Sequence, residues 1–274
     1  MSVCLLLVSA ATAAYAEGDD MGVWLEAGVE KKLYKGLEAG IETDMRLQDN
    51  AGELDRWGVG ASLSYRLYRN EAKTFVVKTE IGARFMRTNH PGYTTMKDSV
   101  FVWDSESETD VYKGREYNVT EGYLLNKFRF YASLSASLEL GRWKLSLRER
   151  YQMTDHDSIS VTRHKWRYDY DTQEIGESVE DVWKGTGDAR QALRSRLQVS
   201  YDIRSCKFDP YAYIEIYNNL EDGCAVQKSR YALGIDYKFM KVNDFKLFYL
   251  YQDRAGDDDV SEHVIGLGYC YSFW

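Results

Sequence analysis

The sequence is poor in the residues and segments that interrupt a sheet or replace it. Its 274 residues include only two prolines, Pro91 and Pro210. We place Pro91 in a connection and Pro210 at the start of a strand, where the sheet does not need a backbone N–H from that residue. No stretch of about 18 apolar residues occurs, which excludes a transmembrane helix, and the mean hydropathy is −0.50. Long strands are therefore the segments to look for.

Cysteine is also scarce and offers no cross-link. Cys4 lies in the N-terminal apolar segment, and three cysteines remain after it. Cys206 and Cys224 fall at opposite ends of one predicted strand, where about ten residues at roughly 3.3 Å each hold them far beyond the span of a disulfide. We predict no disulfide, no metal site and no cofactor, because no ligand spacing supports one.

Aromatic residues, in contrast, are abundant, and the end of the chain shows how they are used. Aromatics make up 14% of the residues, with 22 tyrosines. From Ile265 to Phe273 every second residue is apolar or aromatic, and the residues between them are small or weakly polar. This alternation is typical of a barrel strand with one face on lipid and the other on the lumen.

The same alternation recurs through the chain in segments long enough to cross a bilayer with tilt. A soluble sandwich also alternates, but its strands are nearer five or six residues. We therefore predict an all-β fold, a closed antiparallel transmembrane β-barrel. Because single-chain bacterial barrels have even strand numbers, the eleven segments predict about 12 strands, with 10 as the alternative. The segments are 22–32, 37–48, 55–67, 75–87, 126–140, 143–153, 191–204, 210–218, 229–240, 245–252 and 263–273.

The connections alternate between short and long, which predicts short periplasmic turns and long external loops. The two longest are 88–123 and 154–189, and both are acidic. Strand-like pieces within them, such as 158–162, are expected to prolong the barrel. Aromatics crowd the strand ends beside the short turns, as in the interfacial girdle of such barrels.

The first residues resemble an export signal. Residues 5–8 form a short apolar core, and Ala14-Tyr15-Ala16 is a plausible cleavage site. We expect a signal peptide over 1–16, whose true start lies upstream because a basic region is missing, and the barrel over 17–274. The expected location is the bacterial outer membrane.

Charged residues on the lumen side of the predicted strands form two groups of opposite sign. We expect an acidic wall to face a basic wall, which sets up a field across the lumen. Two interpretations stay open: an ionic network that fills the barrel, since buried charges must be paired or hydrated, or a constricted pore for small polar or charged solutes. The acidic candidates are Glu26, Glu38, Glu42 and Asp44, and the basic candidates are Arg148, Arg150, Arg194 and Arg196.

An enzyme is the alternative from another class. His263 follows Ser261 by two residues, so both side chains point the same way from one strand. A base within hydrogen-bond reach of a nucleophile is what a hydrolase needs. His263 is thus a weak candidate for a hydrolase that acts on lipid or peptide at the outer rim, although this face is also the lipid side. A structural or adhesion barrel with a plugged lumen is the third possibility.

Several short motifs resemble one family. They are Trp24 in a strand that ends Glu-Lys-Lys-Leu, Arg-Glu-Arg-Tyr at 148–151, Leu-Arg-Ser-Arg-Leu at 193–197, Tyr-Ala-Tyr-Ile-Glu at 211–215 and the closing Gly-Leu-Gly-Tyr. They are similar to an uncharacterised, domain-of-unknown-function family of Gram-negative outer-membrane β-barrels. The resemblance implies fold and location and supplies no activity or site.

The expected partners follow from this fold. They are outer-membrane lipid and glycolipid, and the barrel-assembly machinery, which would bind the C-terminal strand. No basic patch with interleaved aromatics indicates nucleic acid. The oligomeric state is left open.

Overall fold

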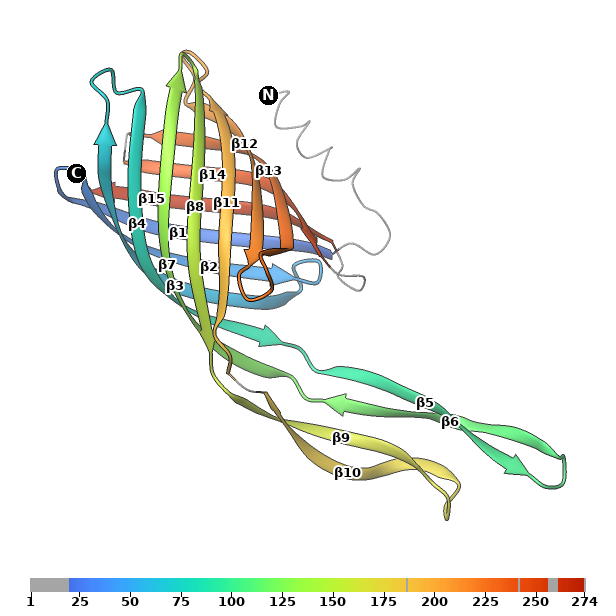
Figure 1. Cartoon of the computed structure of the whole chain (residues 1–274). Helices are drawn as coiled ribbons and strands as arrows, with labels where there is room; N and C mark the ends of the chain where they lie inside the picture. Colours follow the sequence, from blue (N-terminus) through green and yellow to red (C-terminus); the bar gives the residue numbers. More distant parts are fainter. Residues whose placement is uncertain (1–19, 186, 241, 256–260, 274) are drawn as a thin grey trace. The chain divides into compact units, whose positions relative to one another are not determined.

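The computed structural model describes residues 20–185, 187–240, 242–255 and 261–273 (Figure 1). The expected signal peptide over 1–16 lies outside the described residues. None of the described residues forms a helix long and apolar enough to cross a membrane. The fifteen strands are β1 (Asp20–Tyr34), β2 (Leu37–Gln48), β3 (Glu53–Arg69), β4 (Phe75–His90), β5 (Tyr93–Asp104), β6 (Thr109–Thr120), β7 (Tyr123–Leu140), β8 (Trp143–His156), β9 (Ile159–Asp169), β10 (Glu174–Gly185), β11 (Arg190–Tyr201), β12 (Phe208–Asn219), β13 (Ala225–Phe239), β14 (Asn243–Arg254) and β15 (Glu262–Phe273).

Eleven strands close into a barrel in the order β1-β15-β14-β13-β12-β11-β8-β7-β4-β3-β2. The expectation of 12 strands, or of 10, is therefore wrong. The physical reason lies at the closure, where β1 pairs with β15 in parallel, from Asp20 opposite Glu262 to Lys31 opposite Phe273. An even number is needed only when every neighbouring pair is antiparallel, and one parallel pair allows an odd number. The eleven alternating segments of the sequence correspond to the eleven barrel strands.

Glycine forms two of the tight turns between barrel strands. Gly36, between β1 and β2, has a φ of 87°, and Gly141, between β7 and β8, has a φ of 65°. Residues with a Cβ rarely adopt this conformation, so glycine suits these two-residue connections. The turns fix the register that sends alternate side chains to the same face of the sheet.

The two longest connections carry strands of their own. The chain divides into two compact units, the barrel and a second unit of Thr88–Asn126 and His156–Asp188. The second unit holds a four-stranded sheet in the order β10-β9-β6-β5. Its two hairpins join through β6 and β9, where Tyr117 lies opposite Trp166 and their rings stack at 5.4 Å. We call this unit the four-stranded sheet.

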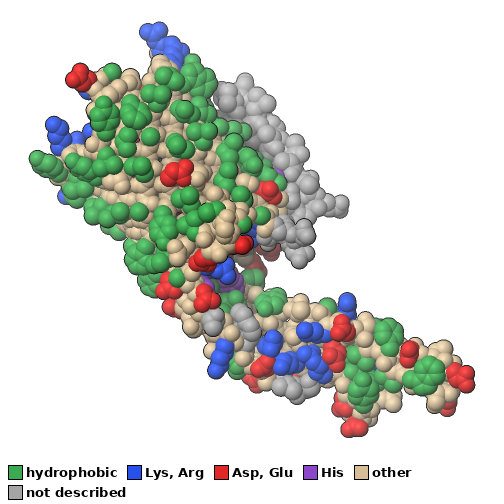
Figure 2. Space-filling view, in the orientation of Figure 1, with side chains coloured by type: hydrophobic (Ala, Val, Ile, Leu, Met, Phe, Trp, Pro, Cys, Tyr) green, Lys and Arg blue, Asp and Glu red, His purple; other side chains and the backbone are tan. Residues whose placement is uncertain are grey.

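The outer face of the barrel is covered with exposed apolar side chains, and Figure 2 shows them over the visible part of the wall. Exposed apolar surface on this scale is typical of the lipid-facing band of membrane barrels. Aromatics near the short turns contact one another in pairs: Tyr68 with Phe75, Trp143 with Tyr201, Phe208 with Tyr237, and Phe245 with Tyr269. Large apolar residues of the outer face include Ile41, Val59, Leu63, Ile81, Phe128, Phe130, Leu134, Leu147, Leu197, Ile214, Leu233, Leu247 and Leu267.

Inside the barrel, aromatic rings lie against glycines of neighbouring strands. A Cβ added at these glycines would overlap the ring, so glycine is what lets each ring lie flat on the wall. The pairs are Tyr131 with Gly82, Tyr211 with Gly234, and Phe248 with Gly266. Phe248 also belongs to a buried apolar cluster with Trp24, Leu250 and Val264, which fills part of the lumen beside β1, β14 and β15.

Candidate functional site: the charged interior of the barrel

Asp44 on β2 is the centre of the first charge cluster. It is 4% exposed, and it accepts contacts from arginines of its own strand and of the next two strands. Arg46 lies at 3.4 Å, Arg56 at 3.2 Å and Arg84 at 2.8 Å. Arg84 also pairs with Glu42. We call Asp44 and these three arginines the Asp44 cluster.

Glu215 on β12 is the centre of the second cluster and has no solvent exposure. Four arginines of β8, β11 and β13 surround its two oxygens. The distances are 2.9 Å to Arg148, 2.8 Å to Arg194, 2.8 Å to Arg196 and 3.6 Å to Arg230. We call this group the Glu215 cluster. Because one carboxylate carries one negative charge, the cluster has an excess of positive charge.

Aromatic rings join the two clusters. The guanidinium carbon of Arg46 lies 3.4 Å from the centre of the Trp24 ring, and that of Arg230 lies 4.9 Å from the same ring. Arg194 and Arg230 both lie over Tyr217, at 4.5 Å and 4.8 Å. Such contacts place cations on the electron-rich ring faces. The clusters therefore form one connected layer of guanidinium groups and rings, which we call the arginine layer.

The eight lumen residues expected from the sequence all lie on the inward rows, but the charges are mixed. The carboxylates of β2 have arginines and a lysine beside them, including Lys78 at 3.3 Å from Glu38. The arginines of β8 and β11 lie opposite each other in register, Arg150 with Arg194 and Arg148 with Arg196. Arg150 pairs with Glu80 on β4 at 3.2 Å. Most expected residues are thus paired with neighbouring strands, and the acidic and basic walls are each partly neutralised in place.

Sequence reasoning missed the residue that organises the basic side. Glu215 occurs within the Tyr-Ala-Tyr-Ile-Glu motif, which carried only the family resemblance. The signal that could have found it was alternation, because Tyr213, Glu215 and Tyr217 share one face and Ile214 and Ile216 share the exposed one. Alternation therefore places Glu215 on the inward row of the strand that follows Arg194 and Arg196 in the chain. A buried carboxylate needs a basic partner, and these arginines can supply it.

Solvent access differs along the lumen. Inward residues near the short turns, such as Glu30 and Lys144, are exposed. Toward the other end of the strands, the inward row is buried at Trp24, Glu215 and other positions of the arginine layer. The lumen therefore has an accessible section followed by a packed one.

His263 lies on the outer face of β15, away from the arginine layer. Its Nδ1 is 2.5 Å from the hydroxyl of Tyr249, and the hydroxyl of Ser261 is 3.1 Å from that of Tyr251. Ser261 and His263 are thus each engaged with a tyrosine of β14. In the part of the chain that the structure describes, no group of three or more His, Cys, Asp or Glu residues is arranged to hold a metal ion, and Cys206, Cys224 and Cys270 are free thiols.

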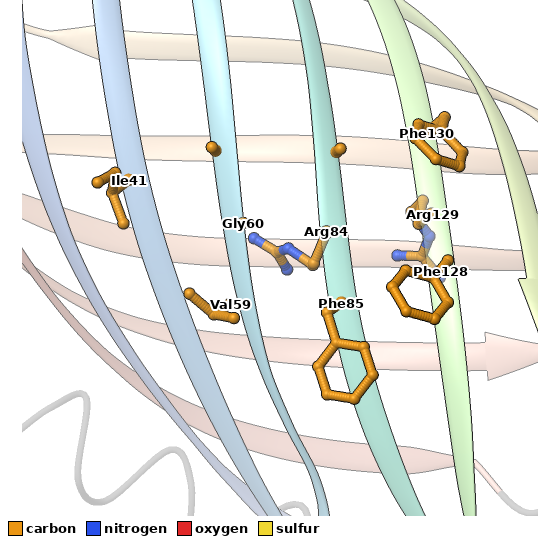
Figure 3. A pocket seen from close by; sticks show the side chains of 10 residues that line it. Ile41, Val59, Gly60, Arg84, Phe85, Phe128, Arg129 and Phe130 are labelled. Atoms are coloured by element: carbon orange, nitrogen blue, oxygen red, sulfur yellow. The ribbon is translucent and has the colours of Figure 1, made fainter.

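A shallow groove of about 420 Å³ runs along the outer wall between β2, β3, β4 and β7 (Figure 3). Apolar side chains line it, including Ile41, Val59, Phe85 and Phe128. An open apolar groove on this face suits a lipid chain.

Comparison with known proteins identifies a family without an assigned role. The family described as "Protein of unknown function (DUF2490)" matches residues 21–261. No curated protein matches the sequence.

Three solved structures are similar to this chain at low identity. The NanC porin is 14% identical, with a TM-score of 0.48 over 93% of this chain and 99% of that one. The β domain of the Bordetella autotransporter BrkA is 13% identical, with a TM-score of 0.46 over 88% and 86%. The translocator domain of the autotransporter NalP from Neisseria meningitidis is 12% identical, with a TM-score of 0.46 over 96% and 91%.

Proposed function

This chain belongs to the DUF2490 family of unknown function, and we propose that it is an outer-membrane barrel through which small polar or charged solutes pass. One observation carries the proposal: the inward rows hold charged side chains, and several near the short turns, including Glu30, Lys144 and Lys246, are exposed to solvent. A barrel that served only as a membrane anchor could fill its lumen with apolar side chains and would not have to bury any charged group, which is energetically costly.

The size of the barrel is compatible with a narrow path. Eleven strands, spaced about 4.8 Å apart and tilted by about 40°, give a backbone diameter on the order of 22 Å. Long side chains from opposite walls then leave a central space of only several ångströms. Solutes the size of small organic ions fit such a space, and larger molecules do not.

The outer surface of the barrel supports the proposed location in the outer membrane and the proposed lipid partners. A closed barrel leaves no unpaired edge, and the exposed apolar side chains of its outer wall suit lipid. We place the barrel in the bacterial outer membrane, in contact with lipid and glycolipid. The C-terminal strand β15, with its exposed Leu267, Tyr269 and Phe273, is the segment we propose for recognition by the barrel-assembly machinery.

A structural barrel with a plugged lumen is the second candidate, and the buried part of the arginine layer favours it. Glu215, Leu250 and Val264 have no solvent exposure although all three face inward. If this packing persists in the membrane, the lumen is closed at this depth.

Single-channel recording in a planar bilayer decides between the two candidates. The folded protein is inserted, and conductance is measured together with the reversal potential under a salt gradient. Stable open steps are the expected result. If the protein migrates as folded on a gel and inserts into the bilayer but shows no conductance steps, the structural barrel with a plugged lumen is the better account.

A further inference from the structure

The arginine layer contains more positive charge than the described residues neutralise. The Asp44 and Glu215 clusters together hold seven arginines on two carboxylates, and Glu42 adds a third carboxylate through Arg84. Arginine does not lose its proton in a protein. Several positive charges therefore remain uncompensated in a largely buried place, where an unpaired charge is costly.

Arg129 on β7 adds an eighth guanidinium and leaves donors open. Its Nε donates to the hydroxyl of Thr154 at 3.0 Å, and it forms no ion pair within the described ranges. Its electrostatic neighbours are other arginines, first Arg56 and then Arg194. Its two Nη groups have no hydrogen-bond partner among the described residues and are not sealed from solvent.

Donors elsewhere in the layer are also unmet. The Nε groups of Arg56 and Arg194 are buried and have no hydrogen-bond partner in the described part of the chain. Arg194 is itself only 9% exposed, and its other nitrogens bond to Gln152 and Glu215. The set of arginines is therefore organised and held in place, but its hydrogen-bonding capacity is not used up by the protein.

We propose that the arginine layer is a binding site for a small oxyanion, a carboxylate or a phosphate, with Arg129 as the donor that no ion pair of the described residues occupies. A planar guanidinium binds either group through two parallel hydrogen bonds. The anion supplies the negative charge that the two carboxylates cannot, and the rings of Trp24 and Tyr217 hold the surrounding guanidiniums in place. The site deepens the proposed passage of solutes, on which it rests, by naming their class.

Calorimetric titration of the folded protein in a neutral detergent at low chloride tests the site. Succinate and inorganic phosphate are the two probes, and binding of at least one is expected. Preference for one probe identifies a carboxylate or a phosphate site. Arg129→Gln breaks no ion pair, so the barrel is expected to fold, and the affinity is expected to fall about tenfold because one charge-assisted contact is lost.

Lys144→Gln is the matched control, because it removes one inward positive charge from the accessible section beside the short turns. Its affinity should equal that of the unaltered protein. Absence of binding for both probes overturns the site. If folded Arg129→Gln and the unaltered protein bind the anion with equal affinity, Arg129 is not part of the binding site.

Binding in detergent does not require an open pore, so the two proposals fail separately. A barrel that conducts but binds neither anion retains the proposed function and loses the site. A barrel that binds an anion but never conducts retains the site and loses the passage of solutes.

Discussion

Glu215 on β12 accepts a hydrogen bond from Nη2 of Arg194 on β11 at 2.8 Å, and both residues are buried in the barrel. The pair belongs to a cluster in which Arg148 and Arg196 bind the other oxygen of the same carboxylate, Oε2, and Arg230 of β13 lies 3.6 Å from Oε1. One acidic residue thus holds arginines of three strands in a single place. Removing it would leave several like charges facing one another at short range, where repulsion is only weakly screened.

Glu215→Gln is expected to lower the free energy of unfolding by about 3–5 kcal/mol, the usual cost of leaving buried partners of an ion pair uncompensated. Glu26→Gln is the control, because Glu26 faces inward but is exposed and forms no described ion pair. Urea unfolding of both variants in detergent, followed by tryptophan fluorescence, measures the difference. Equal midpoints for the two variants would show that Glu215 is not the structural centre of the layer.

Much of the barrel could be predicted because apolar and polar residues alternate along its strands, as a membrane barrel requires. Each barrel strand has one exposed apolar face and one inward face, so Ile214 and Ile216 face outward and Glu215 between them faces inward. Strand number was harder, because nothing in β1 or β15 alone shows that the two pair in parallel. The even-number rule then outweighed a correct count of eleven segments.

The four-stranded sheet could not be found in the same way. Most of β5 is exposed on both faces, so neither lipid nor a core forces its residues to alternate. The ion pairs of the lumen were only partly predictable for a related reason. Alternation shows which residues face inward, but the partner of Arg194 depends on the register of β12 against β11, which the sequence does not display.

Gly266→Ala is expected to destabilise the barrel by about 1–3 kcal/mol, the range for overpacking. The ring of Phe248 occupies the place of the added methyl group, and Trp24 packs against that ring at 6.4 Å. Gly28→Ala is the control on the neighbouring strand β1, since its Cβ would meet only ordinary contacts at 3.5 Å or more. Thermal unfolding compares them, and an unchanged midpoint for Gly266→Ala would mean that the ring does not lie over this glycine.

His164 in the four-stranded sheet should titrate above its ordinary pKa. Its Nδ1 lies 2.5 Å from Oε1 of Glu177 on β10, and this hydrogen bond, with a weaker one to Glu121, raises the pKa of the imidazole. A raised pKa in the folded state stabilises the sheet fully below about pH 6.5, the value of an unperturbed histidine, and the benefit is lost as the pH rises through the folded value.

Proton NMR of the imidazole measures that pKa directly. Glu177→Gln is expected to lower the pKa of His164 toward its ordinary value, because the charged acceptor is lost. Glu174→Gln, a change of the same kind elsewhere on β10, should leave it in place. An equal pKa in Glu177→Gln and the unaltered protein would contradict the hydrogen bond as the cause.

Arg129→Glu is expected to reduce the preference of the pore for anions. The excess of arginines over carboxylates in the arginine layer predicts that the unaltered protein passes anions better than cations. Replacing one positive by one negative charge at several ångströms from the path of the ion, screened by salt, should change the permeability ratio by about twofold.

Reversal potentials under a potassium chloride gradient measure this permeability ratio. Lys31→Glu, on the outward row of β1, is the control for the change of charge alone. A cation-selective unaltered protein, or equal shifts in both variants, would show that the arginine layer does not set selectivity, since of the two altered residues only Arg129 faces the lumen.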